Sequence, residues 1–160
     1  MKMNIAVFLR IMLFISLSVM VYDYLKLEQS FIQMERGFID GFSMYISPWP
    51  GNFFLITTLL FLLANIVIMI NVWRNKNADK RSFLTFEYDV SDERAVGNTR
   101  KAVSHAFSIL LIYSLLMIGS YMYIPNYFVD HIWYPLFTTA SIPIVGLISY
   151  FIVYKVLQYK

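Results

Sequence analysis

Three long stretches without a charged residue constrain this chain more than any other feature. They are Phe53 to Trp73, Ala106 to Ile124 and Ile132 to Tyr154, and none of them contains Asp, Glu, Lys or Arg. A helix needs about 20 mostly apolar residues to cross the hydrocarbon core of a bilayer. Each stretch is therefore predicted to be a membrane-spanning helix.

A fourth apolar stretch, residues 6 to 25, carries two charges close to its ends. Arg10 and Asp23 can each reach a membrane interface, Arg10 by extending along its aliphatic stem. The chain is 59% hydrophobic and 14% charged, and a soluble domain of 160 residues could not bury so much apolar surface. The sequence thus predicts an all-α integral membrane four-helix bundle, a single domain over residues 1–160 with spans at about 6–25, 53–73, 106–124 and 132–154.

The positions of the basic residues predict which side each loop faces, because Lys and Arg near spans are retained in the cytoplasm. Of the 13 Lys and Arg residues, only Lys26 and Arg36 lie in the loop between the first two spans, and the other 11 flank the termini or lie in the 74–105 loop. We therefore expect a multi-pass plasma-membrane protein with cytoplasmic N and C termini and a cytoplasmic 74–105 loop.

The outer loop, residues 24–50, is too long for a structureless connection in a compact protein. Its apolar residues recur every three or four positions, as on one helical face: Leu27, Phe31, Met34, Phe38, Phe42 and Tyr45. The pattern predicts an extracellular amphipathic helix at about 26–45. Its role stays open between a structural cap on the bundle, a lid or docking surface with Phe31 and Phe38 as candidate contacts, and an anchor in the membrane surface.

The inner loop is the longest charged passage of the chain. Ser91 is predicted to be the N-cap of a helix, because acids follow it in the first turn and Arg100 and Lys101 come later, at headgroup level. We expect a short cytoplasmic helix that continues into the third span. Its candidate partner-binding residues are Asp89, Asp92, Glu93, Arg94, Arg100 and Lys101.

The order Asp92-Glu93-Arg94, then Arg100-Lys101-Ala102, then a span resembles a pattern in small bacterial four-helix membrane proteins. Some of these proteins look like partners of small helix-turn-helix regulators. The resemblance covers about a dozen residues, 92–102, immediately before the span. It implies a bacterial inner membrane and a regulatory role, and it implies no catalytic residue.

Sequence patterns for chemistry are missing. The chain has no cysteine, which excludes disulfides, thiolate metal sites and the membrane thiol oxidoreductases. The acidic run "DVSDERAVGNTR" lacks the Gly and the final Glu of a calcium loop, and no protease motif or mid-span carboxylate occurs. We expect no enzyme activity, no metal and no cofactor, and no nucleic-acid binding, because the basic residues alternate with acids.

Within the spans, uncharged polar groups and prolines are the features to explain. Asn65 and Asn71 in the second span are the candidate intramembrane polar residues, and a hydrogen bond that faces the bundle is the expected role for Asn65. Pro135 and Pro143, with Gly146 close behind, are expected to kink the fourth span. The kink serves either packing or a small cavity against the third span, where Gly119 would permit close approach.

Three classes of function are compatible with this architecture. The polar residues are concentrated in loops, which favours a non-enzymatic accessory, immunity or regulatory and sensor subunit. Its partners would be the lipid bilayer and another membrane or cytoplasmic protein, or further copies as a homo-oligomer. A small oligomeric transporter or channel is the alternative, and a lipid-modifying enzyme is the third.

Overall fold

The structure is a computed structural model that describes residues 2–41, 47–74, 92–123, 131 and 133–159. Four long helices make up almost all of this: α1 (Lys2–Glu35), α2 (Pro48–Arg74), α3 (Glu93–Ser120) and α4 (Trp133–Tyr159), with a short 3-10 turn η2 (Tyr121–Tyr123) after α3. Each long helix has the length and composition to cross a membrane and contains an 18-residue stretch with mean hydropathy between 1.8 and 2.3. The predicted all-α class with four membrane-length helices is confirmed for these residues.

Capping residues explain where two of the helices begin. Pro48 occupies the first position of α2, where a missing N–H costs nothing, and the Ser47 hydroxyl accepts a bond from the Trp49 N–H at 3.4 Å. At α3 the N-cap is Asp92, whose carboxylate accepts bonds from the N–H groups of Arg94 and Ala95 at 3.0 and 3.3 Å.

The predicted Ser91 cap is therefore wrong by one residue, and Ser91 itself lies outside the described residues. The carboxylate of Asp92 provides the same acceptor as a hydroxyl and adds a negative charge at the positive end of the helix. From Glu93 the helix runs without a break to Ser120, which confirms that the charged segment continues into the third span.

The separate outer helix at about 26–45 is also corrected. Residues 26–35 are the last turns of α1, which ends in a Schellman motif: the Phe38 N–H donates to the Gln33 carbonyl, and the Gly37 N–H donates to the Met34 carbonyl, each at 2.9 Å. Gly37 has φ 73°, a backbone conformation that favours glycine. The helix thus stops at the first glycine of the region, and residues 42–46 lie outside the described residues.

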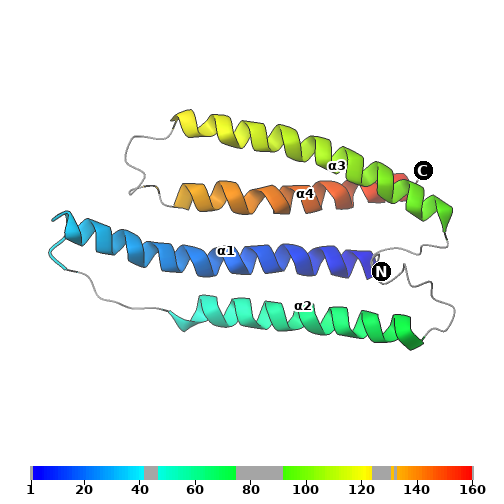
Figure 1. The fold of residues 1–160 in the computed structure, drawn as a ribbon, viewed down its shortest axis with the longest axis horizontal. Coiled ribbons are helices and arrows are strands. Elements are labelled where there is room, and N and C mark those ends of the chain that lie inside the picture. The colour runs from blue at the N-terminus through cyan, green and yellow to red at the C-terminus, as the bar shows by residue number, and fades with distance from the viewer. Residues whose placement is uncertain (1, 42–46, 75–91, 124–130, 132, 160) are drawn as a thin grey trace.

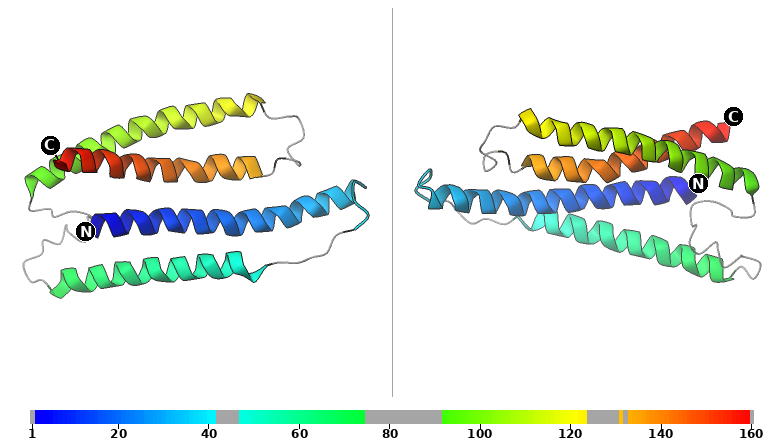
Figure 2. Two further views of the ribbon diagram at one scale, coloured as in Figure 1. Left: turned by 180° about the vertical axis from the view of Figure 1, so that it is seen from behind. Right: turned by 45° about the horizontal axis from the view of Figure 1, so that its top comes forward.

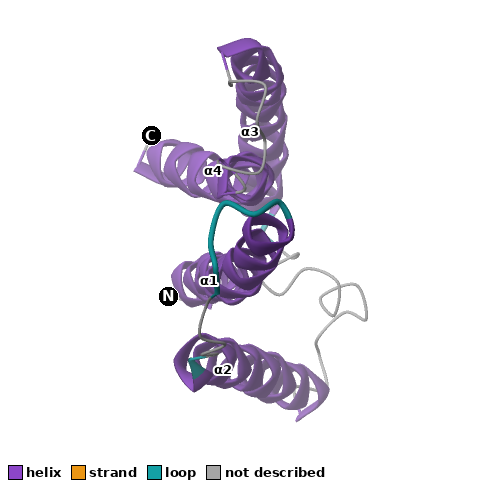
Figure 3. Cartoon of the chain, turned by 90° about the vertical axis from the view of Figure 1, so that its left-hand side faces the viewer, coloured by secondary structure: helices purple, strands orange, loops and turns teal. Residues whose placement is uncertain are grey.

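The helices form an open layer in the order α3, α4, α1, α2 (Figure 1). The main contacts join α3 to α4, α4 to α1, and α1 to α2. The two views of Figure 2 show the same order, and the view along the helices in Figure 3 shows that the row is bent and not closed into a ring. Both ends of the chain lie at the same end of the layer.

Polar bonds hold the α3–α4 hairpin together at several levels. Tyr113 donates to the Ser141 hydroxyl at 2.9 Å, and Tyr121 shares a 2.7 Å bond with Thr138. Tyr134 donates to Ser120 next to the turn. Such bonds between membrane helices contribute about 0.6 kcal/mol each on average, so together they fix the register of the hairpin.

The close approach within this hairpin occurs at Gly146 and not at the predicted Gly119. A Cβ atom built on Gly146 would lie 2.7 Å from Cδ1 of Leu110, whereas one built on Gly119 would meet nothing within 4 Å. The reason is position: Gly146 lies opposite an α3 leucine, while Gly119 is exposed near the end of α3.

Candidate functional site

Four of the predicted partner-binding residues lie together on the first turns of α3. Glu93, Arg94, Arg100 and Lys101 are all exposed, and a spacing of seven residues brings the two pairs to one side of the helix. The two pairs are about 10 Å apart along the axis. We call these four side chains the α3 charged face. The carboxylate of Asp92, another predicted contact, caps the helix, and Asp89 lies outside the described residues.

The opposite side of these turns is held against the rest of the protein. Thr99, Ala102 and Ala106 are buried there. The Asn98 side-chain amide donates to the Leu157 carbonyl at 3.3 Å, which ties the start of α3 to the end of α4. The α3 charged face is therefore presented on a rigid support.

The other predicted contacts, Phe31 and Phe38, lie at the far end of α1. Their side chains are 40% and 75% exposed, and Met34 between them is 40% exposed. Figure 1 shows that this end of α1 extends beyond the adjacent ends of α2 and α4. The role of this surface as a cap, a docking surface or a membrane anchor stays a prediction.

Of the two predicted intramembrane polar residues, the structure describes the side chain of Asn65, whose amide donates within its own helix, unlike the predicted bond toward the bundle. The Asn65 amide donates to the Phe61 carbonyl of its own helix at 2.8 Å and is half-buried. Asn71 lies in the last turns of α2, and its side chain is outside the described set.

The buried polar link that the sequence analysis missed is between Ser16 and Thr57. Their hydroxyl oxygens are 2.7 Å apart across the α1–α2 interface, and their side chains are 0% and 7% exposed. Each hydroxyl also reaches a carbonyl of its own helix, Leu13 for Ser16 and Phe54 for Thr57. Mid-span hydroxyls were the available signal, but the sequence gives no indication that these two face each other.

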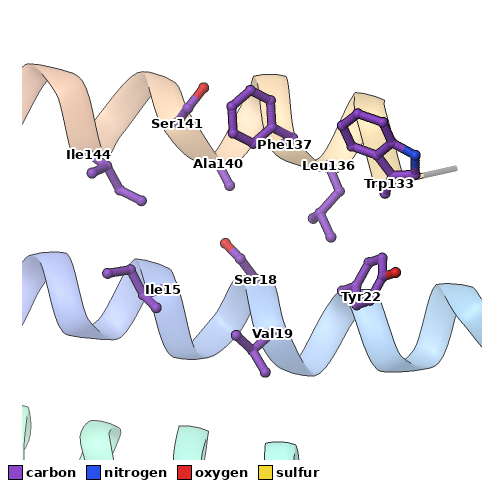
Figure 4. A pocket seen from close by; sticks show the side chains of 10 residues that line it. All are labelled: Ile15, Ser18, Val19, Tyr22, Trp133, Leu136, Phe137, Ala140, Ser141 and Ile144. Atoms are coloured by element: carbon purple, nitrogen blue, oxygen red, sulfur yellow. The ribbon is translucent and has the colours of Figure 1, made fainter. Parts of the chain in front are cut away.

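A groove lies between α1 and α4, in the half of the layer toward the start of α4 (Figure 4). Its volume is about 470 Å³. The residues that line it come from one side of each helix: Ile15, Ser18, Val19, Tyr22, Trp133, Leu136, Phe137, Ala140, Ser141 and Ile144. A cavity next to the Pro143 region was one predicted alternative, but this groove lies against α1 instead of α3.

The lining is apolar in effect, because its two serines are satisfied within the protein. Ser18 donates to the Phe14 carbonyl at 2.6 Å. Ser141 accepts from Tyr113 and donates to the Thr138 carbonyl, and in Figure 4 its hydroxyl points away from α1. The small side chains of Ser18 and Ala140 leave the groove open. In the other half of the α1–α4 interface, larger side chains fill the space between the helices.

That other half contains the apolar cluster that joins three helices. Val7, Ala102 and Tyr154 are its buried members, and Ile11 and Leu147 are among the partly buried residues packed on it. The cluster fixes α1 against α3 and α4 near the chain ends, so the groove occupies the part of the α1–α4 interface that the cluster leaves unfilled.

These features define a class: a helical protein with four helices that could each span a membrane, which suggests a multi-pass membrane protein. Among the described residues, no three His, Cys, Asp or Glu side chains are grouped so as to hold a metal ion. No protein-family model, curated protein or solved structure matches the chain.

Proposed function

We propose that this chain is a non-enzymatic accessory subunit of a bacterial inner membrane, with an immunity or regulatory role, and that it binds its partner through the α3 charged face. The distribution of Lys and Arg supports cytoplasmic termini and a cytoplasmic 74–105 loop. The α3 charged face would then stand at the cytoplasmic membrane surface. The resemblance of residues 92–102 to small bacterial membrane proteins supports the same role.

The observation that carries this proposal is the geometry of α3. Glu93, Arg94, Arg100 and Lys101 are exposed on a helix that is continuous with a span and bonded to α4 through Asn98. Charges carried on a rigid helix favour a partner of complementary charge, because little backbone freedom is lost on binding. Three of the four side chains are basic, so a partner surface with a net negative charge is favoured.

The test removes charge without changing the helix. Arg94, Arg100 and Lys101 are replaced together by Gln, and the chains that co-purify in mild detergent are compared with those of the wild type. The matched control replaces Arg74, Lys76 and Lys80 by Gln, which removes the same charge from the same loop. We expect specific partners to be lost only from the first variant, and equal recovery from both variants would overturn the proposal.

The open layer supports a second candidate, a small oligomeric transporter or channel. Because α2 and α3 lie at the two edges of a bent row, several copies could together enclose a pathway that one copy does not (Figure 3). Substrate flux through proteoliposomes that contain this chain alone would favour transport over the accessory role.

A further inference from the structure

We propose that the α1–α4 groove holds one acyl chain of a phospholipid, with the lipid phosphate at the level of Lys26. This inference is independent of the proposed function, since it concerns the opposite end of the layer from the α3 charged face.

The depth of the groove matches one leaflet. Tyr22 and Trp133 lie at its outer end, and amphipathic aromatic rings prefer the interface between hydrocarbon and headgroups. Ile15 and Ile144 lie at its inner end, seven residues along α1 and eleven along α4 from those rings. At 1.5 Å per residue these distances are about 10 and 16 Å, close to half of the roughly 30 Å hydrocarbon core.

The size and chemistry of the groove select hydrocarbon. Water is disfavoured along most of the groove, because both serine hydroxyls donate within the protein, and Tyr22 and Trp133 place their polar atoms only at its outer end. A helix of a second copy of the chain is the competing occupant, and native mass spectrometry distinguishes it from a lipid by mass. The groove offers about 470 Å³, which suits a flexible chain that enters from the side.

Charge at the open end distinguishes a phospholipid from a plain hydrocarbon. Lys26 is exposed one turn beyond Tyr22, on the same side of α1 as the groove residues. That turn places the Cα atom of Lys26 about 6 Å farther from the membrane centre than that of Tyr22, close to the level of a lipid phosphate. The acid Glu28 accepts a bond from Tyr24 at 3.0 Å, and Asp23 lies about a quarter turn from the groove side. An anionic headgroup is therefore favoured.

The test measures lipid retained by the full chain. Protein from nanodiscs of equal phosphatidylglycerol and phosphatidylcholine, both with palmitoyl and oleoyl chains, is released for native mass spectrometry. We expect one retained phospholipid in the wild type. Val19→Phe and Ala140→Phe, which fill the groove from opposite walls, should each abolish it, whereas Val67→Phe on the exposed side of α2 should retain it.

The headgroup is tested by Lys26→Gln, with Arg74→Gln, an exposed base at the other end of the layer, as its control. The first should lower the preference for phosphatidylglycerol about fivefold, the factor that one lysine near a membrane surface provides, and the second should leave it unchanged. An equal effect of both variants would overturn the headgroup assignment.

Three results would overturn the acyl-chain assignment. They are unchanged lipid retention in both groove variants, an equal loss in the Val67→Phe control, and a wild-type dimer without lipid that the groove variants convert to a monomer. Circular dichroism verifies the helix content of each variant. The groove variants lie on different helices. If one of them does not fold, the other groove variant and the comparison of Lys26→Gln with its control still test the proposal.

Discussion

At the scale of single residues, small side chains decide how closely these helices approach. Ser16 is completely buried against α2, and Gly146 admits a leucine of α3. In a lipid environment apolar burial does not drive helix association, so close packing and hydrogen bonds carry more of the stability. Few residues make these close contacts, so the effect of each on stability can be measured with a single substitution.

Replacing Gly146 should disturb the α3–α4 hairpin. We expect Gly146→Leu to destabilise the protein by about 1–3 kcal/mol, the usual cost of overpacking, because the new side chain occupies the space of Leu110. Gly119→Leu is the control, since nothing lies within 4 Å of a Cβ atom there. Unfolding of both variants in mixed micelles measures the difference, and equal stabilities would contradict the close approach.

The hydroxyl pair should contribute a small coupling energy. A double-mutant cycle with Ser16→Ala and Thr57→Val is expected to give about 0.6 kcal/mol, as for other hydrogen bonds between membrane helices. The value is modest because each hydroxyl also has a carbonyl of its own helix as a partner. Additive effects of the two substitutions would show that the hydroxyls act independently.

At the scale of elements, the sequence predicted which segments are helical, but it did not predict where each helix ends. Periodicity at Leu27, Phe31 and Met34 correctly indicated helix. It could not show that these residues continue α1, because the helical spacing of apolar residues is the same on both sides of a membrane interface. The Schellman end at Gly37 depends on one backbone conformation, and Gly41 was an equally plausible stop.

The cap of α3 makes a direct prediction at this scale. Asp92→Ala should cost about 1 kcal/mol of local helix stability, because the amides of Arg94 and Ala95 lose their acceptor. Ser91→Ala should have little effect. Hydrogen exchange at these two amides reports the difference, and faster exchange in the Ser91 variant than in the Asp92 variant would restore Ser91 as the cap.

At the scale of the whole molecule, helix length and hydrophobicity were predictable and helix arrangement was not. The spans at 6–25 and 53–73 lie entirely within α1 and α2, because about 20 apolar residues have no other stable state in lipid. These helices are apolar nearly all round, so no periodic stripe marks the side that faces a neighbour. The open order α3, α4, α1, α2 and the α1–α4 groove follow from side-chain fit that the sequence does not reveal.

The direction in which the layer crosses the membrane can be tested directly, because the chain contains no cysteine and a single introduced thiol is unambiguous. Phe38→Cys and Glu93→Cys place exposed thiols near opposite ends of the layer. With 11 of the 13 basic residues on one predicted side, a membrane-impermeant maleimide should label Phe38→Cys in intact cells and Glu93→Cys only after permeabilisation. The reverse pattern would place the α3 charged face outside the cell and exclude a cytoplasmic partner there, while the lipid groove would move to the inner leaflet and keep its chemistry.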